Sequence, residues 1–415
     1  AQLLAWIAID DPDAKVADFA CGSGGLLVAA YKRKKWLFEK THNFTEKHHK
    51  KFVEEDLLGV DIMPFAANTA ACHLSLQSPQ YFTDRLKIAI WDSTELDPNK
   101  EIPSIAHIKY TLRGQSTLHS YVGEQTKTKG AIRLGQEKPD NIFLSSQDVV
   151  IMNPPFTRQD KLPKEYKKRL ADRFSEYKNY LDGQMSLYSY FILLADKFLK
   201  EGGVLAFVLP ANCLRIKSLE GVRKLLNEKY NIEYIVTIGG RLNFSEATWK
   251  REILMVAKKL KPKEKRMNTL CITLSTLPKN ESEVIRFTSL IKSGKQSKTE
   301  ELSIIEIPSN KIQEDLDWFR FIASFTGTGV ADIFEEISSQ TSQLIRFGDL
   351  YNFDSVVTRG TELTINKKNF GSLLIPYSID RAIRKKDMWT VDKVERQYLK
   401  LNNRLNENLN LKVPL

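Results

Sequence analysis

The stretch "DVVIMNPPF", residues 148–156, closes an apolar run with an asparagine, two prolines and a phenylalanine. Proline has no amide hydrogen and a fixed φ, and the residue before a proline is pushed away from the helical conformation, so a strand must end here. The carboxamide of Asn153 precedes the backbone carbonyls of Pro154 and Pro155, which point in constrained directions, and the ring of Phe156 follows. These residues predict a rigid polar pocket with a flat aromatic wall. The alternative is a rigid turn.

A glycine-rich motif follows an earlier apolar run. In "ADFACGSGGLL", residues 17–27, we expect a strand to end at Asp18 and the glycines to lead into a helix. Glycine allows a tight turn and a close approach of a ligand to the backbone, and a helix N-terminus favours a negative group such as a carboxylate. A dinucleotide is disfavoured, because Leu27 stands where the third glycine of G-x-G-x-x-G belongs. A turn that binds nothing is the remaining alternative.

Two acidic residues end the next two apolar runs. Asp61 in "GVDIMPF" can accept hydrogen bonds from both hydroxyls of a ribose, and Ile62 beside it can cover a face of an adenine; the alternative is a cap for the following helix. Asp92 in "IWDSTEL" can accept from an adenine amine, and the alternative is capping or turn formation.

All of these motifs stand at the carboxyl ends of apolar runs, which alternate with helical patterns. Seven such runs cover residues 15–20, 57–62, 86–91, 148–152, 204–209, 233–238 and 252–259. Near-continuous apolar runs are typical of strands buried on both faces of a mainly parallel sheet. The sequence therefore predicts an α/β fold with a doubly wound, mostly parallel, seven-stranded Rossmann-like sheet.

The domain organisation is expected to be unequal. We place the α/β domain at 1–265, an edge or linker in the charged, serine-rich stretch 266–300, and a smaller α+β region at 301–415. Residues 32–55 have the pattern of a solvated helical extension with exposed histidines, and 97–147 has no assignable shape. The first residues resemble the end of a helix, so we expect the chain to be a fragment of a longer protein.

Composition narrows the class of function. The chain has 415 residues and a formal net charge of +11, which favours a polyanionic partner such as nucleic acid over an inert basic surface. No run approaches the roughly 20 apolar residues of a membrane span. The four cysteines lack metal-ligand spacing, so we expect no metal, no disulfide and a reducing cytoplasm; they are Cys21, Cys72, Cys213 and Cys271.

"ADFACGSGG" followed by "NPPF" resembles the S-adenosylmethionine-dependent amino-methyltransferases, specifically the adenine-N6 DNA methyltransferases of restriction-modification systems. "GVDIMPFAANTAACHLSL" and "LYSYFILLADKFLKEGGVLAFVLPANCL" are similar to the modification subunits of type I systems and to the methyltransferase parts of fused type II enzymes. The resemblance covers about residues 15–260. It departs at Phe19, where the family often has proline, and the cofactor-binding segment expected before the first strand is largely absent.

The resemblance implies S-adenosylmethionine as cofactor and a set of residues that bind it. The glycine-rich loop would hold the methionine part, Asp61 and Ile62 would bind the ribose and adenine, and Asp92 and Ser93 would contact the adenine. The implied loop residues are Asp18, Phe19, Ala20, Cys21, Gly22 and Gly24.

It also implies a chemistry for residues 153–156. The lone pair of an exocyclic adenine amine is delocalised into the ring, so a catalyst must draw both hydrogens toward acceptors. The Asn153 side chain and the Pro154 carbonyl would accept them, Pro155 would fix that carbonyl, and Phe156 would stack on a flipped base.

A basic segment follows this motif. Residues 157–180 interleave cations with aromatic rings, which favours a DNA-facing loop and helix over an ordinary amphipathic surface helix. The candidate contacts are Arg158, Lys161, Lys167, Lys168 and Arg169. Further on, Phe244 is expected either to cover the second face of the base or to belong to the core.

The implied partners are double-stranded DNA and possible specificity or restriction subunits, with no membrane. "LIRFGDLYNFDSVVTRGTEL", residues 344–363, resembles the opening of a target-recognition domain, the alternative being a structural extension. The same chemistry on RNA or on protein glutamine, and a catalytically silent DNA-binding subunit, stay open as alternative functions.

Overall fold

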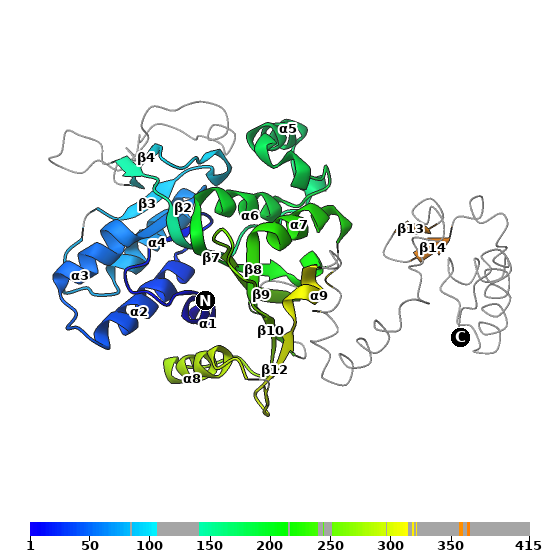
Figure 1. Cartoon of the computed structure of the whole chain (residues 1–415). Coiled ribbons are helices and arrows are strands. Elements are labelled where there is room, and N and C mark those ends of the chain that lie inside the picture. Colours follow the sequence, from blue (N-terminus) through cyan, green and yellow to red (C-terminus); the bar gives the residue numbers. More distant parts are fainter. Residues whose placement is uncertain are drawn as a thin grey trace. The chain divides into compact units, whose positions relative to one another are not determined.

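The structure is a computed structural model in which two units are distinguished, Ala1–Thr328 and Gly329–Leu415 (Figure 1). It describes residues 1–83, 85–105, 141–214, 216–239, 244, 251–295, 297–313, 318, 321, 357–359 and 363–365. In the second unit the description covers one antiparallel pair, β13 (Val357–Arg359) with β14 (Leu363–Ile365). Most of the expected recognition region, and residues 106–140 of the long insertion, lie outside the described residues.

A ten-stranded sheet forms the centre of the first unit, in the order β11-β12-β10-β8-β9-β7-β6-β1-β2-β3. Its strands are β1 (Val16–Asp18), β2 (Leu57–Asp61), β3 (Lys87–Ile90), β6 (Gln147–Met152), β7 (Leu199–Pro210), β8 (Tyr230–Ile238), β9 (Glu252–Lys259), β10 (Thr269–Leu274), β11 (Ser297–Lys298) and β12 (Leu302–Ile307). A separate hairpin pairs β4 (Glu101–Pro103) with β5 (Asn141–Phe143). Each of the seven apolar runs forms a strand of the large sheet, which confirms the α/β prediction.

The sheet is wider than the seven strands expected. β10 pairs in parallel with β8, and β12 and β11 extend it antiparallel, so the stretch 266–300 contains sheet strands rather than a simple linker. The sequence concealed this because charged loops flank short apolar runs there. Residue 265, where we expected the domain to end, lies in the loop between β9 and β10 of the same sheet. The first unit continues to Thr328.

Parallel pairing joins β3, β2, β1, β6 and β7, whereas β9 is antiparallel to both of its neighbours, β7 and β8. The strand order reverses between β1 and β6. In open α/β sheets, ligands bind beyond the carboxyl ends of the strands at such a switch point. The fold therefore directs attention to the residues that follow β1 and β6.

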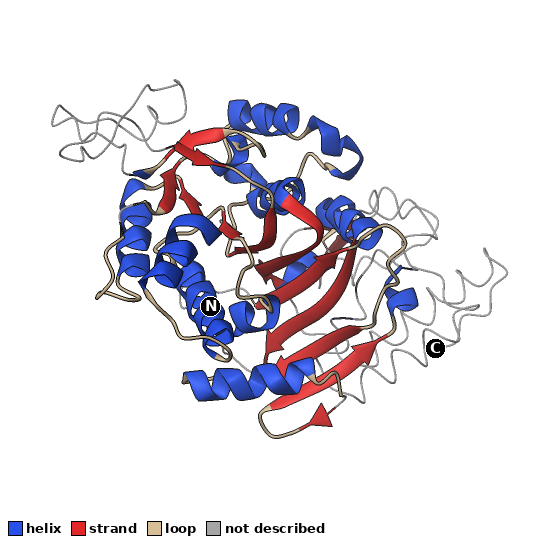
Figure 2. Ribbon diagram, turned by 60° about the vertical axis from the view of Figure 1, so that its left-hand side comes forward, coloured by secondary structure: helices blue, strands red, loops and turns tan. Residues whose placement is uncertain are grey.

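Helices cover both faces of the sheet (Figure 2). They are α1 (Gln2–Ala8), α2 (Gly25–Glu39), α3 (Glu46–Lys50), α4 (Pro64–Ser75), α5 (Lys164–Arg173), α6 (Leu187–Phe198), α7 (Glu220–Lys229), α8 (Glu281–Lys292) and α9 (Ser309–Gln313). Side chains of α1, α2, α4 and α8 share one buried cluster, and those of α6 and α7 belong to the other. Successive residues of β6 alternate between the two clusters, as a strand buried on both faces requires. No described helix is long and apolar enough to cross a membrane.

The segment 32–55 is more buried than expected. The Lys34 side chain is fully buried, forms an ion pair with Asp56 at 3.0 Å and lies 4.8 Å from the Phe52 ring centroid. Lys51 pairs with the same Asp56 at 2.9 Å. Two cations thus neutralise a buried carboxylate, which is the condition under which charged side chains can be buried.

His49 is also buried, contrary to the expectation of exposed histidines. Its Nδ1 lies 2.8 Å from the Tyr31 hydroxyl, which in turn lies 2.9 Å from Ser78 Oγ. Burial lowers the pKa of His49 from its ordinary value of 6.5, because an imidazolium would lose its hydration.

The folded protein should therefore lose stability as the pH falls below about 6.5. The unfolded chain protonates His49 near that value, whereas the folded chain does so only at lower pH, so the free energy of unfolding falls by at most about 1.4 kcal/mol per pH unit between the two. Urea unfolding of the wild type and His49→Gln between pH 8 and 5 measures the difference. The exposed His42→Gln is the control, and parallel pH profiles for all three proteins would contradict this origin.

Candidate active site

The loop after β1 has a backbone that glycine makes possible. Gly22 has a φ of +52° and Gly24 a φ of +83°, a region that side chains disfavour. A Cβ on Gly24 would also lie 3.0 Å from Ala70 of α4. The predicted strand-to-helix turn is confirmed, since α2 begins at Gly25. The loop is thus compact, and its amides lie at the helix N-terminus.

Asp18 is the buried acid of this loop, with 1% of its surface exposed. Burial raises its pKa to about 8 and the charge of Asp61 adds to the shift, while a hydrogen bond from the Ala20 amide at 3.0 Å opposes it. At neutral pH this carboxyl group is therefore largely protonated. A cation placed beside it would favour the carboxylate, so Asp18 is suited to receiving an ammonium group.

Asp61 joins the ends of β1 and β2. One of its carboxylate oxygens accepts from the Gly22 amide and the other from the Met63 amide, both at 2.8 Å. Each carboxylate oxygen has a second lone pair, so Asp61 can still accept two hydrogen bonds from a ligand. Beside it, Ile62 is 45% exposed and Phe65 is 82% exposed. An acceptor and an apolar surface therefore stand together, as a nucleoside requires.

Residues that follow β3 form hydrogen bonds with the residues that follow β1 and with Asp61. The Ser93 hydroxyl is buried and donates to the Phe19 carbonyl at 2.6 Å, and the Trp91 amide donates to the Asp61 carbonyl at 3.0 Å. Asp92 accepts at one oxygen from the amide and hydroxyl of Thr94, at 3.0 and 2.7 Å. Asp92 thus does cap a short turn, which was its alternative interpretation, and Thr94 is a site neighbour that the sequence did not indicate.

Residues 153–156 follow β6 at the same edge of the sheet, because Ala17 of β1 is in register with Val150 of β6. Asn153 is exposed and Pro154 is buried. Phe156 is half-buried and meets the ring of Tyr188 edge-on, with centroids 6.0 Å apart. Tyr188 is buried on α6 and supports the Phe156 ring.

Tyr188 was missed by the sequence reasoning. It is the second residue of α6 and the first of an almost continuous run of buried side chains, and the apolar sequence of this helix was the available signal.

Pro155, Ala20 and Cys21 complete the set of predicted loop and motif residues. Pro155 is exposed, Ala20 is partly buried, and Cys21 is buried, with an amide that donates to the Val60 carbonyl at 3.1 Å. Burial raises the pKa of the Cys21 thiol well above its usual range. Cys21 is therefore a structural residue of the loop rather than a nucleophile.

The basic segment divides into two sets of side chains. Lys161 and Lys168 are exposed and Lys167 is partly exposed; no ion pair joins any of the three to an acid of the described ranges. Arg158 pairs with Asp160 at 3.2 Å. Arg169 is partly buried and pairs with Asp92 at 3.3 Å, so this candidate DNA contact has a partner within the fold.

Phe244 is partly buried and packs against the hydrophobic cluster that contains α2 and α8. This contact is what the core interpretation expects. Its neighbours on both sides, residues 240–243 and 245–250, lie outside the described residues.

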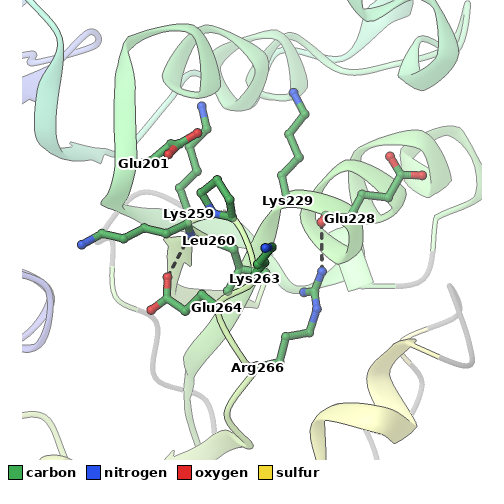
Figure 3. Close-up of a pocket in the computed structure, with 10 residues that line it drawn as sticks. Glu201, Glu228, Lys229, Lys259, Leu260, Lys263, Glu264 and Arg266 are labelled. Atoms are coloured by element: carbon green, nitrogen blue, oxygen red, sulfur yellow. Dashed lines mark hydrogen bonds between the residues drawn. The ribbon is translucent and has the colours of Figure 1, made fainter.

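A hollow of about 550 Å³ lies at the opposite edge of the sheet, where β7 and β8 begin and β9 ends (Figure 3). Lys229 and Lys259, which line it, both pair with Asp196 at 2.9 Å. Arg266 donates to the Glu228 carbonyl at 2.9 Å. These cations already have partners within the fold, so we place no ligand there.

The proteins to which this chain is similar are restriction-modification methyltransferases. The model of the Eco57I restriction-modification methylase family matches residues 55–244. The type II restriction enzyme and methyltransferase RM.Eco57I of Escherichia coli is 23% identical over 260 residues, covering 57% of this chain and 24% of that protein. The type II methyltransferase M.HincII of Haemophilus influenzae is 35% identical over 89 residues, covering 21% of this chain and 18% of that protein.

Among solved structures, the type IIG restriction endonuclease BpuSI is similar in fold, with a TM-score of 0.51 and 16% identity over 90% of this chain and 37% of that one. The chain spans 24% of the length of RM.Eco57I and 18% of the length of M.HincII. Residues 55–244 of this chain are therefore similar to the Eco57I restriction-modification methylase family, and the α/β fold is similar to that of BpuSI.

Proposed function

We propose that this protein transfers a methyl group from S-adenosylmethionine to the exocyclic N6 of an adenine that is flipped out of double-stranded DNA. One observation carries the proposal: the "NPPF" residues follow β6 directly beside the glycine-rich loop that follows β1, at the switch point of the sheet. The family match supports a restriction-modification methyltransferase. Adenine as the target rests on the chemistry of the motif.

The residues beside β1 and β2 fit the proposed cofactor. Asp18, which a cation beside it would convert to the carboxylate, suits an ammonium group. Asp61 keeps free lone pairs for ribose hydroxyls, and exposed Ile62 suits an adenine face. When bound, S-adenosylmethionine supplies an electrophilic methyl group. The protein's own part is to hold and orient this group toward the space in front of Asn153.

At the motif, two acceptors act on one amine. The Asn153 side-chain oxygen and the Pro154 carbonyl each accept an N–H of the adenine amine, which localises the nitrogen lone pair for attack. Pro155 restricts the direction of that carbonyl, and the Phe156 ring, supported by Tyr188, stacks on the base. Proton loss follows transfer readily, so no general base is needed and catalysis is mostly positioning.

The exposed lysines beside the motif would hold the DNA backbone. Lys161, Lys164 and Lys168 lie on the segment that follows residues 153–156, and their charge is not neutralised by acids of the described residues. Residues 301–415 would begin a target-recognition region. We further propose that the enzyme acts in the cytoplasm with specificity or restriction subunits that share its DNA site.

Asn153→Ala should abolish methyl transfer and leave cofactor affinity within about twofold. Loss of one acceptor removes stabilisation of the transition state, worth about 100-fold or more in rate. Labelled S-adenosylmethionine, methyl-free DNA and mass spectrometry of the digested nucleosides measure the product. N6-methyladenine from the wild type alone supports the site; a methylated RNA or glutamine product, or equal activity of the variant, would contradict the proposal.

Asp61→Ala should raise the dissociation constant of S-adenosylmethionine by at least about tenfold. The change removes the acceptor for ribose and also the group that holds the Gly22 amide. Calorimetric titration gives the affinity, and thermal unfolding shows whether the fold is kept. Asp160→Ala, which changes an exposed acid four residues after Phe156, is the control.

Replacing Lys161, Lys164 and Lys168 together by glutamine should weaken DNA binding and make its salt dependence shallower by up to about 2.7 in the slope of log affinity against log salt. With each phosphate contact that is lost, binding of the protein releases fewer counterions from the DNA. The matched control replaces the exposed lysines Lys261, Lys263 and Lys265 at the opposite edge of the sheet. Equal slopes for the two triple variants would place the DNA elsewhere.

A further inference from the structure

Helix α5 has an inward face that contacts the segment after β3. Tyr166, Arg169, Leu170 and Arg173 recur at helical spacing; Leu170 is buried and the other three are partly buried. Tyr166 Oη lies 3.3 Å from Thr94 Oγ1. The Arg169 guanidinium lies over the Tyr166 ring, 4.9 Å from its centroid. The helix that carries the exposed lysines is therefore also packed against the adenine end of the proposed cofactor site.

Arg169 joins two carboxylates there. Its Nη2 lies 3.3 Å from Asp92 Oδ2 and its Nη1 lies 3.3 Å from Glu95 Oε1. Burial raises the pKa of Glu95 and the charge of Asp92 adds to this, while Arg169 and Arg173 oppose the shift. Two acids that repel each other are thus held together by one planar cation, which can meet both at once.

The Asp92 carboxylate keeps one acceptor position that a ligand could use. Asp92 Oδ1 accepts two hydrogen bonds from Thr94, and Oδ2 faces Arg169. A carboxylate offers about four lone-pair positions, so one on Oδ2 is left for an amine. The Asp92 side chain is 11% exposed, which is enough for an amine to reach it while its orientation is fixed from both sides.

We propose that Arg169 is a positioning residue, which holds the Asp92 carboxylate in place for the amine of the cofactor's adenine. The inference rests on the proposed function of the Asp92 site. Without Arg169, Asp92 and Glu95 repel each other and Asp92 Oδ2 loses its fixed direction. The residue thus acts on cofactor affinity through Asp92, from a helix whose outer face carries the lysines.

The test is calorimetric titration of S-adenosylmethionine into the full chain, without DNA. Arg169→Gln should raise the dissociation constant by about tenfold. The matched control is Arg173→Gln on the same helix, because Arg173 pairs with Asp97 at 3.0 Å but does not touch Asp92. A role that only docks α5 would lower affinity equally in both variants, and this result would overturn the proposal.

Two rescue variants separate positioning from general damage. Arg169→Gln combined with Glu95→Gln should recover part of the affinity, because the repulsion of Asp92 is removed. Arg169→Lys should fall between wild type and Arg169→Gln, since an ammonium cannot bridge both acids in the same plane. No recovery in either variant would overturn the inference, as would tighter binding by Arg169→Gln, which would mean that Arg169 competes with the adenine.

Titration of the wild type separates failure of the proposed function from failure of the role of Arg169. Binding of S-adenosylmethionine by the wild type with unchanged affinity in Arg169→Gln refutes the role of Arg169 and leaves the proposed function standing. If the wild type binds no S-adenosylmethionine, the proposed function fails and the role of Arg169 fails with it.

Discussion

Parallel pairing of β1 with β2 on one side and β6 on the other is the constraint on which the candidate site depends. It brings three strand ends to one edge, where their backbone groups have no further strand to pair with. Side chains take over this pairing: Asp61 receives the Gly22 amide, and Ser93 donates to the Phe19 carbonyl. The polar residues that a ligand would meet are thus also those that hold the edge together.

Charge is arranged differently on the two sides of this edge. Asp18 forms no ion pair with a cation of the described residues, and burial raises its pKa to about 8. Asp92 instead faces Arg169 and is held by Thr94. The first arrangement favours binding of a positive group, and the second leaves an acceptor of fixed direction for a neutral amine. One short edge of the sheet therefore offers two chemically distinct acids.

Local sequence predicted the features that depend on local physics. The apolar runs at 57–62 and 204–209 formed strands because their residues could be buried on both faces, and the glycines after Asp18 formed a turn. What failed depended on distant partners. Lys34 is buried because Asp56 lies opposite, and the ion pairs of Arg169 with Asp92 and Glu95 could not be read from the sequence. The basic residues of α5 surround too much of the helix for charge alone to indicate its buried face.

The pairing of β1 with β6 joins residues far apart in the chain: the Lys15 amide donates to the Asp148 carboxylate, 133 residues later. Closing so long a loop is slow compared with forming contacts between neighbours in sequence. The chain loses conformational entropy before the contacts between β1 and β6 can stabilise it. During synthesis from the N-terminus, β1, β2 and β3 emerge before β6 exists. Asp18 and Asp61 therefore leave the ribosome before Asn153 does. Asn153 reaches the same edge of the sheet only when β6 pairs with β1.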